Sequence, residues 1–157
     1  MLDFTFSDTL TPALDRARKA ALDFTPVMGA IADYMRSTTV LRFETETGPT
    51  GAKWQPSQRA LEEGGLTLTK SGELKLSMTA DSDATSAITG TNKIYAAIHQ
   101  FGGTIRPRTS RALRTPFGPR ASVTMPAREF LGFSPDDVTE IEAMLGDHIN
   151  AAFEGRA

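Results

Sequence analysis

The side chains best suited to chemistry are two histidines, His99 and His148, and two closely spaced carboxylates, Asp81 and Asp83. Neither histidine has a second histidine or a carboxylate at ligand spacing, since Asp147 and His148 are adjacent and diverge on a helix. Asp81 and Asp83 could serve a metal, but their Ser and Thr neighbours are typical of a turn. The absence of cysteine excludes thiolate nucleophiles, disulfides and Cys-ligated metals.

Enzyme signatures are missing as well. The sequence contains no Gly-x-Ser-x-Gly elbow, no Gly-x-Gly-x-x-Gly motif and no Walker loop. We therefore predict that the chain is not an enzyme, with no catalytic, cofactor-binding or metal-binding residues. A small hydrolase would need a catalytic pair that the sequence does not show. We expect His99 to be structural, with its ring hydrogen-bonded to a backbone carbonyl.

Length and composition indicate one globular domain. The chain has 157 residues, of which 39% are hydrophobic and 23% charged, enough to bury a core. No apolar run approaches the length of a membrane span, and the start "MLDFTFSDTL" lacks the basic and apolar regions of a signal peptide. We expect a protein made in a cytoplasm and kept there, or assembled there into something larger.

The net charge of −2 conceals a basic block. Between Ala84 and Arg128 there is no Asp or Glu, so its seven bases give +7 and leave −9 for the remainder. Such a block favours contact with nucleic acid or with an acidic protein surface. The alternative is a solvated loop that carries arginines for solubility. The seven bases are Lys93, Arg106, Arg108, Arg111, Arg114, Arg120 and Arg128.

Periodicity and turn residues predict the elements. Alternation over 2–7 predicts a strand, and two Thr-Pro pairs predict helices over about 12–22 and from 26 towards 43, the second with a stripe of Val27, Ile31, Tyr34, Met35, Thr38 and Leu41. A helical turn is expected at 72–76, before two strands that meet near 81–83. Ser134, Pro135 and Asp137 predict the start of a C-terminal helix with a stripe of Val138, Ile141, Leu145, Ile149 and Ala152.

Three further segments are distinctive. "IYAAIHQFGG" predicts a two-turn helix with Tyr95, Ile98 and Phe101 on its apolar face, closed by two glycines. From about 104 to 122 the chain is rich in Arg, Pro and Thr without a clear period, which predicts a protruding arm or long hairpin that a partner orders. The single tryptophan, Trp54, is either a core plug or an anchor for a partner subunit.

Four segments occur in the order found in the phage virion morphogenesis family, which the chain resembles. They are "FETETGPTGAKWQP", "LTKSGELKLSMTA", "YAAIHQFGG" and "PAREFLGFSPDD", and they cover Phe43 to Asp137. Ser57 replaces a usual Leu, and Met125 replaces a usual Ile. The residues that carry the last two motifs are expected to be structural: Tyr95, His99, Gln100, Phe101, Gly102, Gly103, Pro126, Arg128, Phe130, Leu131 and Gly132.

The resemblance implies an α+β fold and a structural role. It implies a single domain over 1–157, with a small, mostly antiparallel sheet packed against the long helix and the C-terminal helix, and with the Arg-rich arm extended. The implied function is that of a tail completion protein, a tail terminator or head–tail connector that forms a ring at the neck of a bacteriophage virion. Such a viral protein would be assembled in the bacterial host cytoplasm.

The resemblance also implies the partners. They are further copies in a six-fold ring and neighbouring neck, portal-side or tail-tube proteins, with phage DNA passing through the lumen and no membrane. Subunit contact is favoured over DNA contact, because alternating Pro and Arg suit an extended strand on an acidic protein face. A nucleic-acid-binding module based on the 84–128 block is the alternative, although aromatics are sparse there. The interface candidates are Arg106, Arg108, Arg111, Arg114, Arg120 and Trp54.

Overall fold

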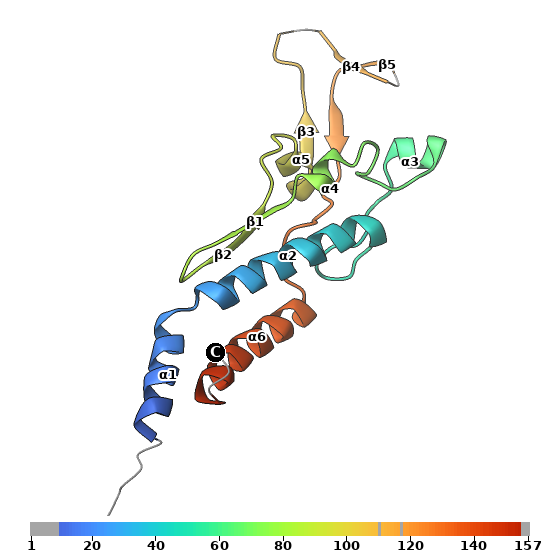
Figure 1. Ribbon diagram of the computed structural model, residues 1–157. Helices are drawn as coiled ribbons and strands as arrows, with labels where there is room; N and C mark the ends of the chain where they lie inside the picture. The colour runs from blue at the N-terminus through green and yellow to red at the C-terminus, as the bar shows by residue number, and fades with distance from the viewer. Residues whose placement is uncertain (1–9, 110, 117, 155–157) are drawn as a thin grey trace, which may run out of the picture. The chain divides into compact units, whose positions relative to one another are not determined.

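The computed structural model describes residues 10–109, 111–116 and 118–154, so the strand expected over 2–7 lies outside the described residues. Figure 1 shows the elements along the chain. The helices are α1 (Leu10–Leu22), α2 (Thr25–Thr45), α3 (Gln58–Glu63), α4 (Glu73–Leu76), α5 (Ala96–Phe101) and α6 (Pro135–Glu154). The strands are β1 (Thr79–Ser82), β2 (Ala87–Gly90), β3 (Gly103–Ile105), β4 (Leu113–Thr115), β5 (Gly118–Arg120) and β6 (Val123–Met125).

Contacts along the chain divide it into two compact units. The first comprises 1–35, 80–89 and 135–157, insofar as these are described, and the second comprises 36–79 and 90–134. This division says which parts of the chain pack together and does not test the number of domains. The single domain expected over 1–157 therefore stays a prediction.

The first unit is built from helices. On α2, Val27, Ile31 and Met35 recur every four residues and are buried, as the predicted stripe required. Residues of α6 pack against them, and α1 lies beside α6. From β2, the Thr89 hydroxyl donates to the Ala32 carbonyl of α2 at 3.0 Å. The α6 residues in this core are Ile141, Met144 and Leu145.

Local capping explains where these helices begin. At α2, Asp23 Oδ1 accepts a hydrogen bond from the Thr25 amide at 3.0 Å. Helix α6 begins at Pro135, as predicted. Its Asp137, expected as a capping acid, is 3% exposed and accepts a hydrogen bond from the Tyr34 hydroxyl at 3.2 Å. Burial and the Asp137 charge raise the pKa of Tyr34.

The second unit has an aromatic core. Phe43 and Phe130 are 0% exposed, with ring centroids 5.2 Å apart, and Trp54 stands edge-on to Phe43 at 5.4 Å. Leu74, Met78 and Ala96 complete the buried cluster. The residues come from α2, the loop after it, α4 and the residues that follow it, α5 and the segment after β6, so the core joins parts of the chain that are distant in sequence.

The α+β class is confirmed, with strands in two-stranded pairs: β1–β2, β3–β6 and β4–β5. The last two pairs are antiparallel, with Ile105 opposite Val123 and Leu113 opposite Arg120. These two pairs do not form one continuous ladder, because the connections between them differ in length. Residues 106–112 connect β3 to β4, whereas only residues 121–122 connect β5 to β6. Pro107 also lacks an amide donor.

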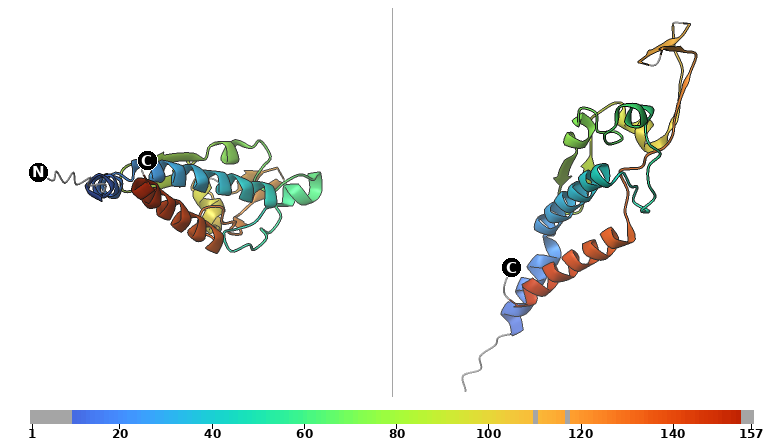
Figure 2. Two further views of the ribbon diagram at one scale, coloured as in Figure 1. Left: turned by 60° about the horizontal axis from the view of Figure 1, so that its bottom comes forward. Right: turned by 90° about the vertical axis from the view of Figure 1, so that its right-hand side faces the viewer.

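The described residues among 103–125 form what we call the arginine hairpin, in the place of the predicted arm. Figures 1 and 2 show β3 and β6 running away from α5, with β4 and β5 at the far end. Thr104 and Thr124 face each other across β3 and β6, with hydroxyls 3.2 Å apart. At the far end, the Thr115 hydroxyl donates to the Gly118 carbonyl at 2.7 Å.

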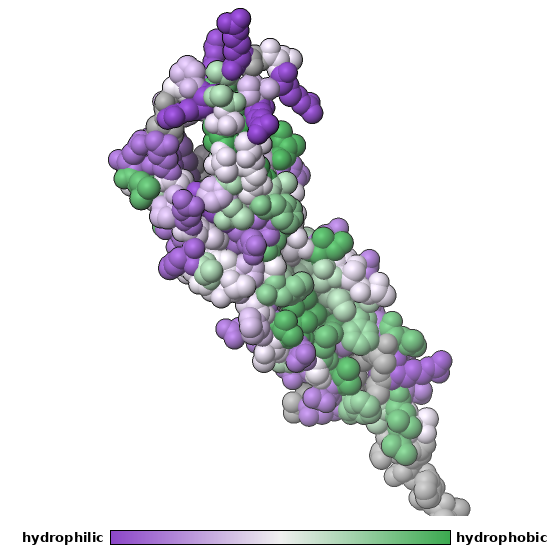
Figure 3. Space-filling model, turned by 180° about the vertical axis from the view of Figure 1, so that it is seen from behind, coloured by the Kyte–Doolittle hydropathy of each residue, from purple (hydrophilic) through white to green (hydrophobic). Residues whose placement is uncertain are grey.

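Several apolar positions predicted to face a core are exposed instead. Leu41 is 54% exposed, Val138 45% and Ile149 39%, so the predicted stripes on α2 and α6 extend further than the buried ones. On α6 the buried side is Ile141, Met144 and Leu145, which lie one turn apart. Figure 3 shows apolar surface gathered over the helices of the first unit.

Candidate assembly interface

Gln100 joins the two predicted structural motifs. From α5, its side-chain oxygen accepts hydrogen bonds from the amides of Phe130 and Leu131, both at 3.0 Å. Its side-chain nitrogen donates to the Leu131 carbonyl at 2.9 Å. This one side chain therefore replaces a strand partner for the segment after β6.

Glycines permit the close approach on which this arrangement depends. Gly102, with φ +68°, closes α5, and a Cβ there would lie 2.7 Å from the Ala127 amide nitrogen. At Gly132, with φ +141°, a Cβ would lie 2.8 Å from Cγ of Pro49. Neither position accepts a side chain without movement of its neighbours.

Two buried arginines fasten the same segment. Arg128 is 3% exposed, and its Nε donates to the Gln55 carbonyl at 2.7 Å. Arg42, 7% exposed, donates through Nη1 to the carbonyls of Phe130 at 3.0 Å and Gly132 at 2.8 Å. Arg128 thus belongs to the base of the hairpin and not to its exposed cationic surface. Sequence patterns do not indicate the role of Arg42, because a helical arginine is usually a surface residue.

The ring of His99 does not make the predicted hydrogen bond through its Nδ1 atom. Its backbone carbonyl accepts the Arg128 amide at 2.7 Å, but its buried ring Nδ1 has no hydrogen-bond partner, so the predicted bond from the ring to a carbonyl is not made through this atom. Burial and the nearby Arg128 charge lower the pKa of His99, and burial also lowers the pKa of Arg128. The ring packs edge-on to Tyr95 at 6.2 Å.

Two residues of the apolar face predicted for α5 do not point to the core. Phe101 is 79% exposed and Tyr95 38% exposed, whereas Ala96 is buried. Ala96 and Gln100, four residues apart, form the inward face, because a small residue lets the helix approach and Gln100 reaches the backbone beyond it. A pattern based on apolar residues could not find a face made by alanine and glutamine.

For Trp54 the contacts favour the core plug over the partner anchor. The side chain is 7% exposed, and its Nε1 donates to the Glu129 carbonyl at 3.0 Å. Both its apolar surface and its polar atom are therefore used within the second unit.

The remaining interface candidates lie together on the arginine hairpin. All five of its arginines are exposed, and the hairpin contains no acidic residue. Figure 3 shows strongly hydrophilic side chains around its far end. Because the hairpin sequence itself contains no acid, these guanidinium groups present a positive surface. The five are Arg106, Arg108, Arg111, Arg114 and Arg120.

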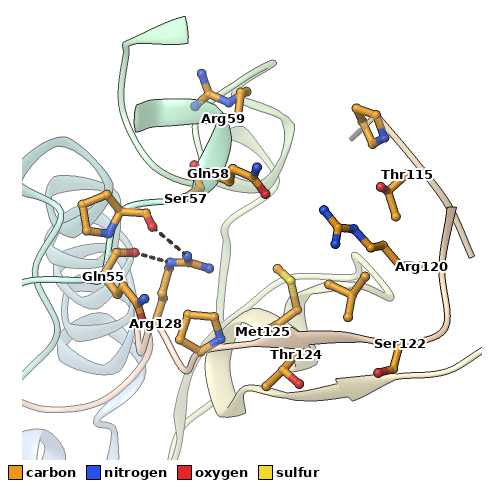
Figure 4. A pocket seen from close by; sticks show the side chains of 14 residues that line it. Gln55, Ser57, Gln58, Arg59, Thr115, Arg120, Ser122, Thr124, Met125 and Arg128 are labelled. Atoms are coloured by element: carbon orange, nitrogen blue, oxygen red, sulfur yellow. Dashed lines mark hydrogen bonds between the residues drawn. The ribbon is translucent and has the colours of Figure 1, made fainter. Parts of the chain in front are cut away.

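A cavity of about 600 Å³ lies between the hairpin and the segment 55–59. Figure 4 shows Arg120 on one side of it and Arg59 and Arg128 on the other. Arg59 donates to the carbonyls of Gly64 at 3.0 Å and Leu66 at 2.6 Å, so its position is fixed by backbone. No acid lines the cavity, which continues the positive surface of the hairpin.

Asp83 serves a turn. Its Oδ1 accepts the amides of Thr85 at 2.7 Å and Ser86 at 2.8 Å, and these bonds lower its pKa to about 2. Among the described residues there is no cluster of His, Asp and Glu that could hold a metal ion. Nor does the described part of the chain include a helix long and apolar enough to cross a membrane.

An exposed cationic hairpin on a base of buried hydrogen bonds is suited to contact with other macromolecules. The chain belongs to the phage virion morphogenesis family, whose sequence pattern matches residues 7–150. Membership of this family gives the chain a structural or assembly role in building a phage virion.

Two relatives are similar over most of the chain. The chain is 31% identical over 147 residues to the Mu-like prophage FluMu G protein 2 of Haemophilus influenzae, and this alignment covers 94% of each protein. It is 32% identical over 133 residues to the putative capsid assembly protein G of Escherichia phage Mu, which covers 78% of this chain and 77% of that protein. No solved structure matches the chain.

Proposed function

We propose that the protein is a non-enzymatic structural subunit of the head–tail neck. In this role it forms a ring that completes the tail and joins it to the head, and it acts through protein–protein contacts. The observation that carries the proposal is the arginine hairpin, whose five exposed arginines stand on a base that buried side chains hold in place. The family's role in virion morphogenesis supports it.

The hairpin is suited to an interface because its arginines can contact a partner while the buried cores stay intact. Its arginines make no contribution to the buried clusters of either unit, so their charge is available to an acidic neighbour. Charged surfaces of this kind guide association and exclude wrong partners, since like charges brought together cost several kcal/mol.

The proposal is tested by replacing Arg106, Arg108, Arg111 and Arg114 together with Glu in a phage that depends on this protein. We expect separate filled heads and unjoined tails, with an unchanged melting temperature for the purified variant. Replacement of the same four by Gln distinguishes loss of attraction from repulsion. Normal numbers of infectious particles from the Glu variant would show that the hairpin is a passive loop.

The second candidate function is nucleic-acid binding through the same five arginines. A phosphate-binding surface would give an affinity for short duplexes that falls steeply with salt, with a slope near −0.9 for each phosphate contacted. We expect the purified protein to bind duplexes weakly and without such a slope. Tight, strongly salt-dependent binding that the Gln variant loses would favour this function instead.

A further inference from the structure

We propose that the arginine hairpin of one copy docks on an acidic stripe along α6 of the next copy. This inference rests on the proposed ring and names the surface that the hairpin meets. It commits to a second copy of this chain as the partner, because the chain carries two exposed surfaces of opposite charge.

The first surface is the hairpin itself. Its five arginines are exposed and no carboxylate lies among them. Leu113 and Arg120 face each other across β4 and β5, while Arg114 pairs with Pro119. Neighbouring positions on a strand point to opposite faces, so Arg114 and Arg120 place charge on both sides of the hairpin. Such a surface needs a partner that presents several carboxylates in a row.

The second surface lies on α6, which has six acidic residues and no Lys or Arg. Asp137 is buried, and the other five acids are exposed. Four of these follow one another at intervals of four, seven and seven residues, which keeps them within about 40° around the helix and spreads them over about 27 Å. We call these four the acidic stripe: Asp136, Glu140, Asp147 and Glu154.

The stripe is distinct from the side of α6 that packs inward. Ile141, Met144 and Leu145 pack against the first unit's core, whereas the stripe residues are exposed. Burial and the Asp137 charge are the main causes that raise the pKa of Tyr34, and the charges of Glu140 and Asp136 add to them. The remaining exposed acid, Glu142, lies two residues from Glu140 and about 200° from it around the helix.

A contact between two different surfaces of the same chain is heterologous, and it closes into a ring when the rotation between copies allows. Hairpin to stripe is such a contact, since each copy offers one surface of each kind. The hairpin carries five exposed arginines and the stripe four exposed carboxylates, so the two surfaces are of opposite sign and similar charge.

The test reverses each surface separately. One variant carries Arg106→Glu, Arg108→Glu, Arg111→Glu and Arg114→Glu, and a second carries Glu140→Lys and Asp147→Lys. Self-association of the full chain is measured by sedimentation at high protein concentration and an ionic strength of about 0.01 M, where screening reaches about 30 Å. We expect each variant alone to associate at least about tenfold more weakly than the natural chain.

Mixing the two variants decides the question. The Glu hairpin of the first fits the Lys stripe of the second, and the natural hairpin of the second fits the natural stripe of the first, so an equal mixture should associate again. Glu140→Lys alone is measured as well, and Glu142→Lys is its matched control: it makes the same charge change on another side of α6 and should leave association unchanged, whereas Glu140→Lys should weaken it. Melting temperatures confirm that each variant is folded.

The inference would be overturned by the absence of salt-sensitive association of the natural chain, by failure of the mixture to associate, or by an effect of Glu142→Lys equal to that of Glu140→Lys. Association that returns only when both sets of changes lie in one chain, and not in the mixture, would also overturn the inference. That result would mean that the hairpin and the stripe meet within a single copy. The proposed neck role would survive these results if the hairpin variants still left heads and tails unjoined, because the hairpin would then meet a different protein.

Discussion

Gln100→Ala tests whether one side chain holds the two motifs together. The substitution removes the acceptor of two amides, on Phe130 and Leu131, and the donor to the Leu131 carbonyl. The 0% exposure of Phe130 leaves water little access to its amide. A buried polar group without a partner costs about 1–3 kcal/mol, so we expect a loss of about 2–4 kcal/mol in the free energy of unfolding.

Urea unfolding and thermal melting measure this loss. For a chain of this length, about 2–4 kcal/mol corresponds to a fall in Tm of roughly 5–15 °C. Gln100→Glu should lose less, because it keeps an acceptor for both amides while losing the donor. Gln58→Ala is the control, since the exposed Gln58 makes one surface hydrogen bond, at 2.8 Å to Glu62, and its loss should stay within about 0.5 kcal/mol. A Gln100→Ala variant as stable as this control would refute the role assigned to Gln100.

Further predictions concern glycines, pH and association. Gly102→Ala should destabilise the chain by more than about 2 kcal/mol, whereas Gly146→Ala, in a helix with nothing within 4 Å, should stabilise it by about 0.5–1 kcal/mol; opposite signs in urea unfolding check both. Because the pKa of His99 is lowered, the unfolded chain binds its proton first, and stability should fall as pH drops through the ordinary value of 6.5 towards the lower folded value. His99→Phe should flatten that part of the pH profile, and an unchanged profile would contradict the assignment. At micromolar concentration and physiological salt the purified protein should be monomeric or weakly associated by light scattering, and a stable ring without other virion proteins would count against this.

Patterns in the sequence located most of the elements. The Thr-Pro and Ser-Pro pairs mark the starts of α2 and α6, and the glycines after Phe101 mark the end of α5. These signals act locally, through missing donors and positive φ, and they do not depend on what the element packs against.

Features set by distant parts of the chain could not be predicted in the same way. The inward face of α5 depends on Gln100 reaching a segment thirty residues later. The buried role of Arg42 depends on carbonyls near Gly132. The hairpin was predicted as an arm, but its two separate ladders follow from the unequal lengths of chain between the strands. The cationic candidates were found because the absence of acids is visible in sequence alone, while the partner of those arginines stays a prediction.

Imaging an intact particle in which this protein has been located tests the proposed neck function most directly. We expect a ring of copies at the junction of head and tail, with the arginine hairpin of each copy against a neighbouring acidic surface. Particles that hold the protein away from the junction would contradict the proposed neck function.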